Sequence, residues 1–181
     1  SLPQLPVTLK SLTAENCRRL QTLPEFPLLL ETITIQESDS ITSIPLLPPQ
    51  LKSLAIVRSL MDNPPPVTAF TSIPSLPPTL TYLSIKGYNI TSLPNLPNIM
   101  IGLSCDNLQL TNLPPLPDSL RSFSCTNNQI AILPTLPPKL EYLYANTNQI
   151  TGIPTLPAGL IFLTVDWNLL TSLPALPNTL T

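Results

Sequence analysis

The sequence of 181 residues contains no histidine, only four glycines and few charged side chains. Without histidine, the chain has neither a His-based catalytic triad nor a zinc site with a histidine ligand. Four glycines are too few for the phosphate-binding loops of nucleotide enzymes, and no Walker loop or GxGxxG motif occurs. Charged residues make up 10% of the chain, the net charge is −2, and lysine and arginine form no run. We therefore expect no nucleic-acid partner.

Two further absences bear on the compartment. No apolar stretch approaches the roughly 20 residues that cross a bilayer, so we expect no membrane insertion. The first residues lack the basic, apolar and small-residue regions of a signal peptide. Three cysteines, Cys17, Cys105 and Cys125, are too few for a disulfide-stapled scaffold, and we interpret them as reduced thiols in a cytosolic setting.

Proline, by contrast, is abundant and regularly spaced. Of the 25 prolines, 18 fall in the pattern (Leu/Ile)-Pro-x-(Leu/Phe)-Pro, which occurs nine times. The pattern begins at residues 2, 23, 44, 73, 93, 113, 133, 153 and 173. These starts define eight full repeats, seven of 20 or 21 residues and one of 29, followed by a partial ninth. A period of this length predicts a solenoid of stacked repeats, forming a single domain over 1–181.

Each repeat also predicts its own secondary structure. In the repeat from Leu133, the apolar residues Leu143 and Ala145 stand two apart, which predicts a strand over 142–146. The prolines exclude helix from the other half, because proline lacks an amide hydrogen and restricts the residue before it. We expect a parallel β-sheet on the concave side, extended polyproline-like chain on the convex side, and little or no helix.

Asparagine follows the predicted strand in three repeats, at Asn128, Asn148 and Asn168. We expect these amides to bond backbone groups in the turns between coils. Cys17 and Ser38 take the matching place in N-terminal repeats and Asn107 lies one residue early, so looser or altered turns are expected there. Cys105 and Cys125 fall on inward strand positions of adjacent repeats, and we interpret them as small buried hydrophobes.

These repeats resemble the bacterial leucine-rich repeats of the YopM, IpaH and SspH effector family. The unit of that family reads much like residues 113–123 here, followed by Asn128 and Ile130, and the resemblance extends over residues 2–180. It implies a leucine-rich-repeat solenoid that serves as a non-catalytic protein-interaction domain. It further implies a virulence factor that type III secretion delivers into the host cell cytoplasm, where the concave face binds a host protein.

Some members of this family join the repeats to a ubiquitin-ligase domain with a Cys-x-Asp motif. No cysteine of this chain has an aspartate two residues later, so we expect no enzymatic activity within residues 1–181, and no cofactor or metal. Two alternatives stay open: the chain is the substrate-recognition half of a ubiquitin-ligase effector, or it is a surface adhesive or structural repeat protein. Exposed repeat ends and sheet edges also allow self-association.

The candidate partner-binding residues are those that point out of the predicted sheet and those at its exit. Four of the nine aromatic residues lie on this face; Tyr142, Tyr144 and Phe162 are expected to touch, with Trp167 at the strand exit. Aromatic clusters ringed by polar groups are typical of binding hot spots, although cross-strand packing that merely stabilises the sheet is the alternative. The predicted partner-binding residues are Tyr82, Lys86, Tyr142, Tyr144, Asn146, Phe162, Asp166 and Trp167.

The repeat from Ile44 is eight or nine residues longer than its neighbours, with the excess at about 60–69. Solenoids accommodate insertions as loops, often on the face used for recognition. Three successive prolines at 64–66 would keep this loop stiff and reduce the entropy lost on binding. We therefore predict contacts from Met61, Asp62, Asn63 and Val67, with a neutral, tolerated insertion as the alternative.

Overall fold

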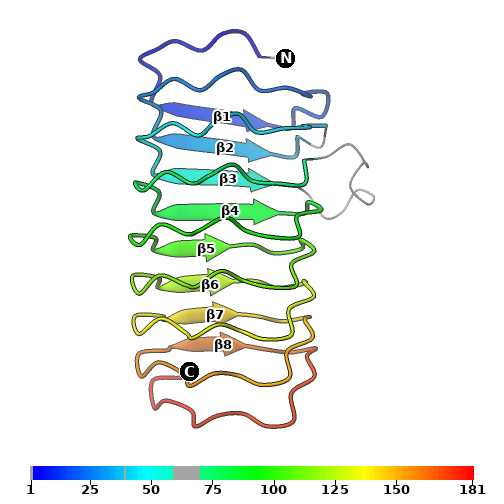
Figure 1. Ribbon diagram of the computed structural model, residues 1–181, viewed down its shortest axis with the longest axis vertical. Coiled ribbons are helices and arrows are strands. Elements are labelled where there is room, and N and C mark those ends of the chain that lie inside the picture. Colours follow the sequence, from blue (N-terminus) through cyan, green and yellow to red (C-terminus); the bar gives the residue numbers. More distant parts are fainter. Residues whose placement is uncertain (1, 39, 59–69) are drawn as a thin grey trace.

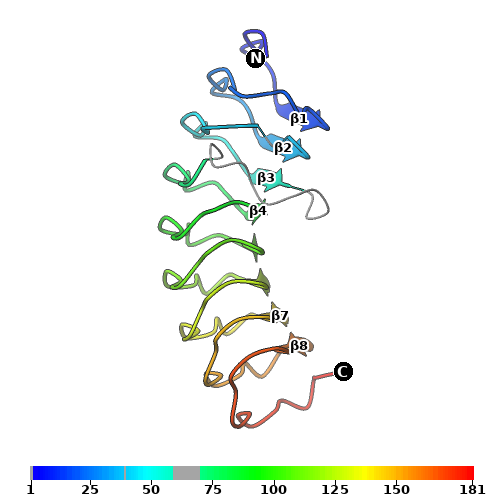
Figure 2. The same ribbon diagram turned by 90° about the vertical axis from the view of Figure 1, so that its right-hand side faces the viewer.

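The computed structural model describes residues 2–38, 40–58 and 70–181, which form a curved stack of coils with one strand per repeat. The strands make a single parallel sheet in sequence order, and the two ends of the chain lie at opposite ends of the stack (Figure 1). Seen from the side, the sheet lines the concave face of the arc (Figure 2). The described residues contain no helix. The strands are β1 (Ser11–Glu15), β2 (Thr32–Gln36), β3 (Ser53–Val57), β4 (Tyr82–Lys86), β5 (Gly102–Ser104), β6 (Ser122–Ser124), β7 (Tyr142–Tyr144) and β8 (Phe162–Thr164).

The leucine-rich-repeat solenoid expected from the sequence is therefore confirmed. Neighbouring strands pair with equivalent residues opposite one another, as in Ser11↔Thr32 and Tyr142↔Phe162. Alternate strand residues point inward: Leu143 is fully buried while Tyr142 on the same strand is exposed. The interior of each coil is filled by the apolar positions of the repeat, such as Leu140, Leu143, Ala145 and Ile150, all at 0% exposure.

The proline-rich half of each coil is extended and then closes through a turn. The carbonyl of the second proline in the pattern accepts a hydrogen bond from the amide three residues later, as from Leu140 to Pro137 at 3.1 Å. The same bond recurs in all nine repeats. A further proline at Pro49, Pro78 or Pro138 occupies the second position of three of these turns, where its fixed φ is favourable. The turn leads the chain from the convex side into the strand.

The strands of the C-terminal repeats are shorter than predicted. The expected strand over 142–146 ends at Tyr144. A continued ladder would join the Asp166 amide to the Ala145 carbonyl, but this amide donates to Oδ1 of Asn146 at 2.9 Å. The Ala145 carbonyl accepts instead from Nδ2 of Asn168, also at 2.9 Å. Side-chain amides thus replace this one bond of the ladder, while the amides of Ala145 and Thr147 still donate to the carbonyls of Thr164 and Asp166.

The N-terminal turns differ, as the sequence predicts. Sγ of Cys17 and Oγ of Ser38 donate to carbonyls of their own repeat, so they do not interrupt the ladder between repeats. Strands β1 to β3 accordingly keep five residues and pair along their full length. The chain then turns tightly within the repeat, with the Leu20 amide donating to the Cys17 carbonyl at 2.8 Å.

Candidate protein-binding face

The concave face consists of the outward strand positions, which the parallel register aligns in columns across the sheet. The first column ends in Tyr142 and Phe162, and the second in Tyr144 and Thr164. Most other members of both columns are serine, threonine, alanine or glycine. Large side chains therefore stand above a sheet surface that is otherwise nearly flat.

Two of the predicted aromatic residues are in direct contact on this face. The rings of Tyr144 and Phe162 lie 5.2 Å apart, centroid to centroid, with an angle of 39° between their planes. Tyr142 is 37% exposed and stands opposite Phe162 in the register. Tilted rings at this distance attract one another beyond the area that they bury. Tyr144 of this pair also lines a depression in the middle of the concave face.

Trp167 lies apart from this pair, in the turn that follows β8. Its side chain is 85% exposed, and its backbone is left-handed with a φ of 57°. The equivalent left-handed position in other repeats is held by Asn107, Asn127 and Gly87, and also by Glu37 and Thr147. Asparagine and glycine tolerate this conformation, whereas a bulky residue is strained in it. Among the described residues, no ring contacts the indole of Trp167.

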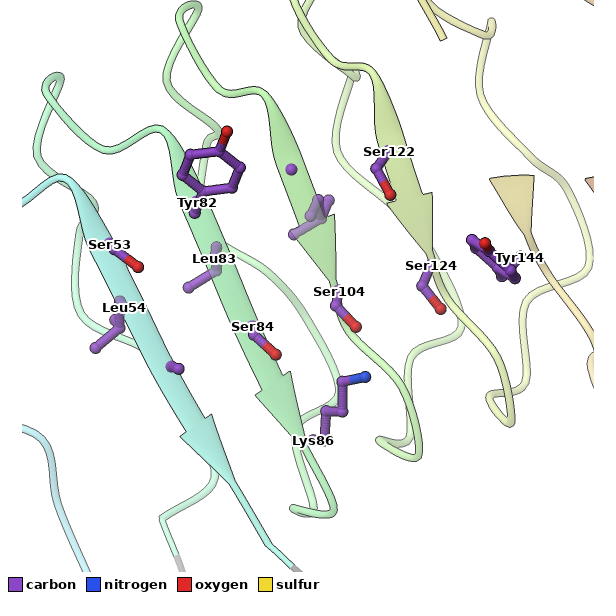
Figure 3. Close-up of a pocket in the computed structure, with 13 residues that line it drawn as sticks. Ser53, Leu54, Tyr82, Leu83, Ser84, Lys86, Ser104, Ser122, Ser124 and Tyr144 are labelled. Carbon is purple, nitrogen blue, oxygen red and sulfur yellow. The ribbon is translucent and has the colours of Figure 1, made fainter. Parts of the chain in front are cut away.

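A depression of about 490 Å³ lies in the middle of the concave face, over β3 to β7. Tyr144 stands at one side and Tyr82 rises from β4 with Ser53 and Leu54 of β3 beyond it, while mostly small residues lie on the strands between the two tyrosines (Figure 3). The Tyr82 side chain lies over Gly102, where a Cβ atom would come within 2.8 Å of its Cδ1 atom. The floor residues are Ser84, Gly102, Ser104, Ser122 and Ser124.

Asp106 organises the polar groups at one side of this depression. Its Oδ2 atom accepts from Oγ of Ser104 and lies 2.9 Å from Nζ of Lys86. Its Oδ1 atom accepts from Oγ of Ser124 and from the amide of Thr126. The carboxylate thus receives four donors. Lys86, a predicted binding residue, is 37% exposed and forms an ion pair with Asp106.

Of the other predicted contacts, Asn146 and Asp166 are joined to each other by the bond that ends the strand ladder. Sequence reasoning singled out the tyrosines and Lys86 but missed the serines and Gly102 that lie between them. A signal was present: two tyrosines in outward columns are separated by repeats that carry only small outward residues at Gly102, Ser104, Ser122 and Ser124. Partner contacts from Met61, Asp62, Asn63 and Val67 fall outside the described residues.

The charged residues at the edge where strands begin are already paired. Glu31 lies between two lysines, 2.6 Å from Nζ of Lys52 and 3.6 Å from Nζ of Lys10. The hydrogen bond from Lys52, together with its charge, lowers the pKa of Glu31. Arg121 and Glu141, which directly precede β6 and β7, form a second ion pair. The rim therefore offers alternating charges rather than a field of one sign.

The interior holds two cysteines, Cys105 and Cys125, at 1% and 0% exposure. Both are free thiols, and burial raises the pKa of each. In the described part of the chain, histidine, cysteine, aspartate and glutamate form no group of three that could hold a metal ion. A search of the same residues for a helix long and apolar enough to span a membrane found none.

Known proteins resemble this chain in structure. Comparison of the sequence with protein-family models and with curated proteins gave no match. YopM from Yersinia enterocolitica WA-314 superposes with a TM-score of 0.84 at 33% identity, over 99% of this chain and 38% of its own. YopM from Yersinia pestis gives 0.77 at 34% identity, over 99% of this chain and 55% of its own. A Shigella effector leucine-rich-repeat domain gives 0.62 at 31%, over 74% of this chain and 57% of its own.

The chain has the structure of the repeat region of bacterial leucine-rich-repeat effectors. The two YopM structures match 99% of this chain, with about one residue in three identical. This agrees with the resemblance of the repeat motif in the sequence. The chain spans 38% to 57% of the length of the matched chains. The family resemblance thus covers the solenoid, and it supports a domain built for protein interaction.

Proposed function

We propose that this solenoid is a non-catalytic interaction domain of a secreted bacterial effector and that it binds a host protein in the host cell cytoplasm. The observation that carries the proposal is the concave sheet, where Tyr82, Tyr142 and Phe162 are 51%, 37% and 36% exposed above a floor of small residues. Exposed aromatic groups on a rigid surface are the usual anchors of protein interfaces. A packed sheet beneath them limits the entropy lost on binding.

The local arrangement supports binding over a purely structural role for these rings. Each coil already encloses a continuous apolar interior, and Leu143 and Leu160 in it are fully buried. Tyr82 and Tyr142 add little to that interior because they point to the opposite side of the sheet. Their exposed ring area would be covered only by another molecule.

A capture experiment tests the proposal. The chain and its Tyr142→Ser/Tyr144→Ser variant are immobilised and exposed to host-cell lysate, and bound proteins are quantified by mass spectrometry. Serine is the native residue at both columns of the preceding strand, Ser122 and Ser124, so the variant is compatible with the sheet. We expect at least about a tenfold loss of the specific partner, the scale of a binding hot spot.

The matched control is Leu46→Ser, which removes an exposed apolar side chain (82% exposed) outside the sheet. It should leave capture unchanged. Equal capture by the folded tyrosine variant, or an equal loss in the Leu46 control, would remove the concave face from the proposal.

A further inference from the structure

The depression between Tyr82 and Tyr144 has the form of a receptacle for one side chain. Tyr82 and Tyr144 stand three strands apart, and the outward residues of the strands between them are Gly102, Ser104, Ser122 and Ser124, with Leu103 also reaching the floor. Tyr144 is held in place by the Phe162 ring at 5.2 Å, and Tyr82 rests over Gly102. The depression lies over β3 to β7, and further repeats pack on both sides of these strands. Because three strand spacings amount to roughly 14 Å, a flat aromatic guest stacks against one of the two rings and not against both.

The hydrogen-bonding capacity of the floor is set by Asp106. An ionised carboxylate can only accept, so the hydroxyl hydrogens of Ser104 and Ser124 must point toward it. The lone pairs of both serine oxygens are then left to accept hydrogen bonds from a guest. The floor consequently favours a guest with an N–H or O–H donor.

The charges next to the floor disfavour an ionised guest. Nζ of Lys86 and the Asp106 carboxylate are 2.9 Å apart and neutralise each other. A cation that approached the Ser104 oxygen would come near the Lys86 ammonium, and an anion would come near Asp106. Either would also lose its hydration on entering the depression, without a free counter-charge to replace it.

We propose that this depression receives a single uncharged aromatic side chain with a hydrogen-bond donor, a tryptophan or a tyrosine, from the protein bound on the concave face. The inference rests on the proposed function and specifies the chemistry of its central contact. The ring packs against Tyr82 or Tyr144 above the small residues, and its donor reaches the oxygen of Ser104 or Ser124. This combination of apolar body and polar tip belongs to tryptophan and tyrosine among the natural side chains.

The test uses small probes and the chain alone, so it needs no knowledge of the partner. Indole, 1-methylindole and ethylguanidinium are titrated separately into isotope-labelled protein, and the amide shifts of Gly102, Ser104 and Ser124 are followed by NMR. For indole we expect saturable shifts with a dissociation constant on the order of millimolar, as for a ligand of its size. 1-Methylindole lacks the donor and should bind about threefold to tenfold more weakly, the value of one hydrogen bond. Ethylguanidinium should bind more weakly than either indole.

Matched variants separate the donor contact from general packing. Ser104→Ala/Ser124→Ala should abolish the preference for indole over 1-methylindole, whereas Ser104→Thr/Ser124→Thr keeps the hydroxyls and the preference. Both residues occur natively in this column, as Ala55 and Thr164. Gly102→Ala displaces the Tyr82 ring and should weaken indole binding, while Gly152→Ala, with nothing within 4 Å of the added Cβ, should not.

Three results would overturn the inference: no saturable shift with indole, equal affinity for both indoles in the native chain, or tighter binding of ethylguanidinium. These outcomes leave the proposed function standing if capture by the concave face still depends on Tyr142 and Tyr144. Conversely, donor-dependent indole binding without concave capture would keep the receptacle and reject the host-protein proposal.

Discussion

Nδ2 of Asn148 lies 2.9 Å from the carbonyl oxygen of Cys125, one repeat earlier in the chain. The same amide group also donates to the carbonyls of Ala145 and Asn146, and its Oδ1 atom accepts from the amide of Ile130 at 3.1 Å. One buried side chain thereby links two coils and bonds backbone groups beyond the end of the short strands, including the Ile130 amide. Asn128 and Asn168 repeat the arrangement.

Replacing Asn148 with alanine should destabilise the fold by about 1–3 kcal/mol, because the Ile130 amide loses its acceptor and three carbonyls each lose one of two donors. Gln149→Ala is the control; this neighbour is exposed, and its loss should change stability by less than about 0.5 kcal/mol. Urea unfolding followed by circular dichroism measures both. Similar midpoints for the two variants would show that water replaces the amide at no cost.

Trp167→Asn should change stability and binding in opposite directions. Asparagine suits the left-handed φ of 57° and is native at this position in other repeats, so stability should rise by about 0.5–1 kcal/mol. If the indole contacts the partner, capture falls at the same time. Thermal unfolding and quantitative capture test the two halves. If the variant is more stable and still captures the partner fully, Trp167 strains the backbone but does not take part in binding.

The two buried thiols predict a pH dependence above neutrality. Burial raises the pKa of Cys105 and Cys125 in the folded chain, so the unfolded chain loses their protons first as the pH rises past about 8.5. Their contribution to stability is present below that pH and falls above it, by up to about 1.4 kcal/mol per pH unit for each thiol. Unfolding midpoints between pH 7 and 10 measure this slope.

Cys105→Ala/Cys125→Ala supplies the comparison for the thiol effect. Ala145 occupies the same inward position in the next repeat and is fully buried, so alanine fits the column. The double variant should lose stability at neutral pH but show a shallower decline at high pH. An identical slope in both proteins would assign the decline to other groups.

Hydroxyl groups join the turns of neighbouring repeats, and one more can be added. Oγ1 of Thr79 lies 2.8 Å from the carbonyls of both Pro49 and Leu51, and Thr179 makes the same contacts one repeat back. Exposed Lys139 has the equivalent place in its own repeat. Lys139→Thr should therefore raise stability by about 0.5–1.5 kcal/mol. Lys139→Val, equally branched but without the hydroxyl, should bring no such gain in the same unfolding measurement.

The architecture could be predicted from the sequence because every repeat of a solenoid has nearly the same local structure and the same neighbours. Equivalent residues such as Leu143 and Leu163 face equivalent neighbours, so twenty-residue spacing and two-residue alternation were enough to place them inside. The asparagines followed from the same logic, since their amides meet carbonyls that recur in every coil. The paired prolines excluded helix because proline lacks an amide hydrogen and restricts the residue before it in every repeat.

The depression could not be predicted in this way, because it depends on differences between repeats. Its shape requires the Tyr82 ring to lie over Gly102 of the next strand, which is a matter of side-chain rotamer. The donor preference of its floor depends on Asp106 reaching two serines on separate strands. The length of the strand likewise depends on whether the Asp166 amide donates to a backbone carbonyl or, as observed, to the Asn146 side chain. Periodicity carries no information about such choices.

Strands of this sheet contact only their immediate neighbours in sequence. Among the described strands, no contact between distant repeats would therefore resist a pulling force applied to the two ends. Coils should detach one after another from an end, each releasing roughly 70 Å of chain for its twenty or so residues. A single-molecule extension trace would then show successive ruptures at this spacing, with one longer step for the 29-residue repeat and larger forces where an asparagine amide links two coils.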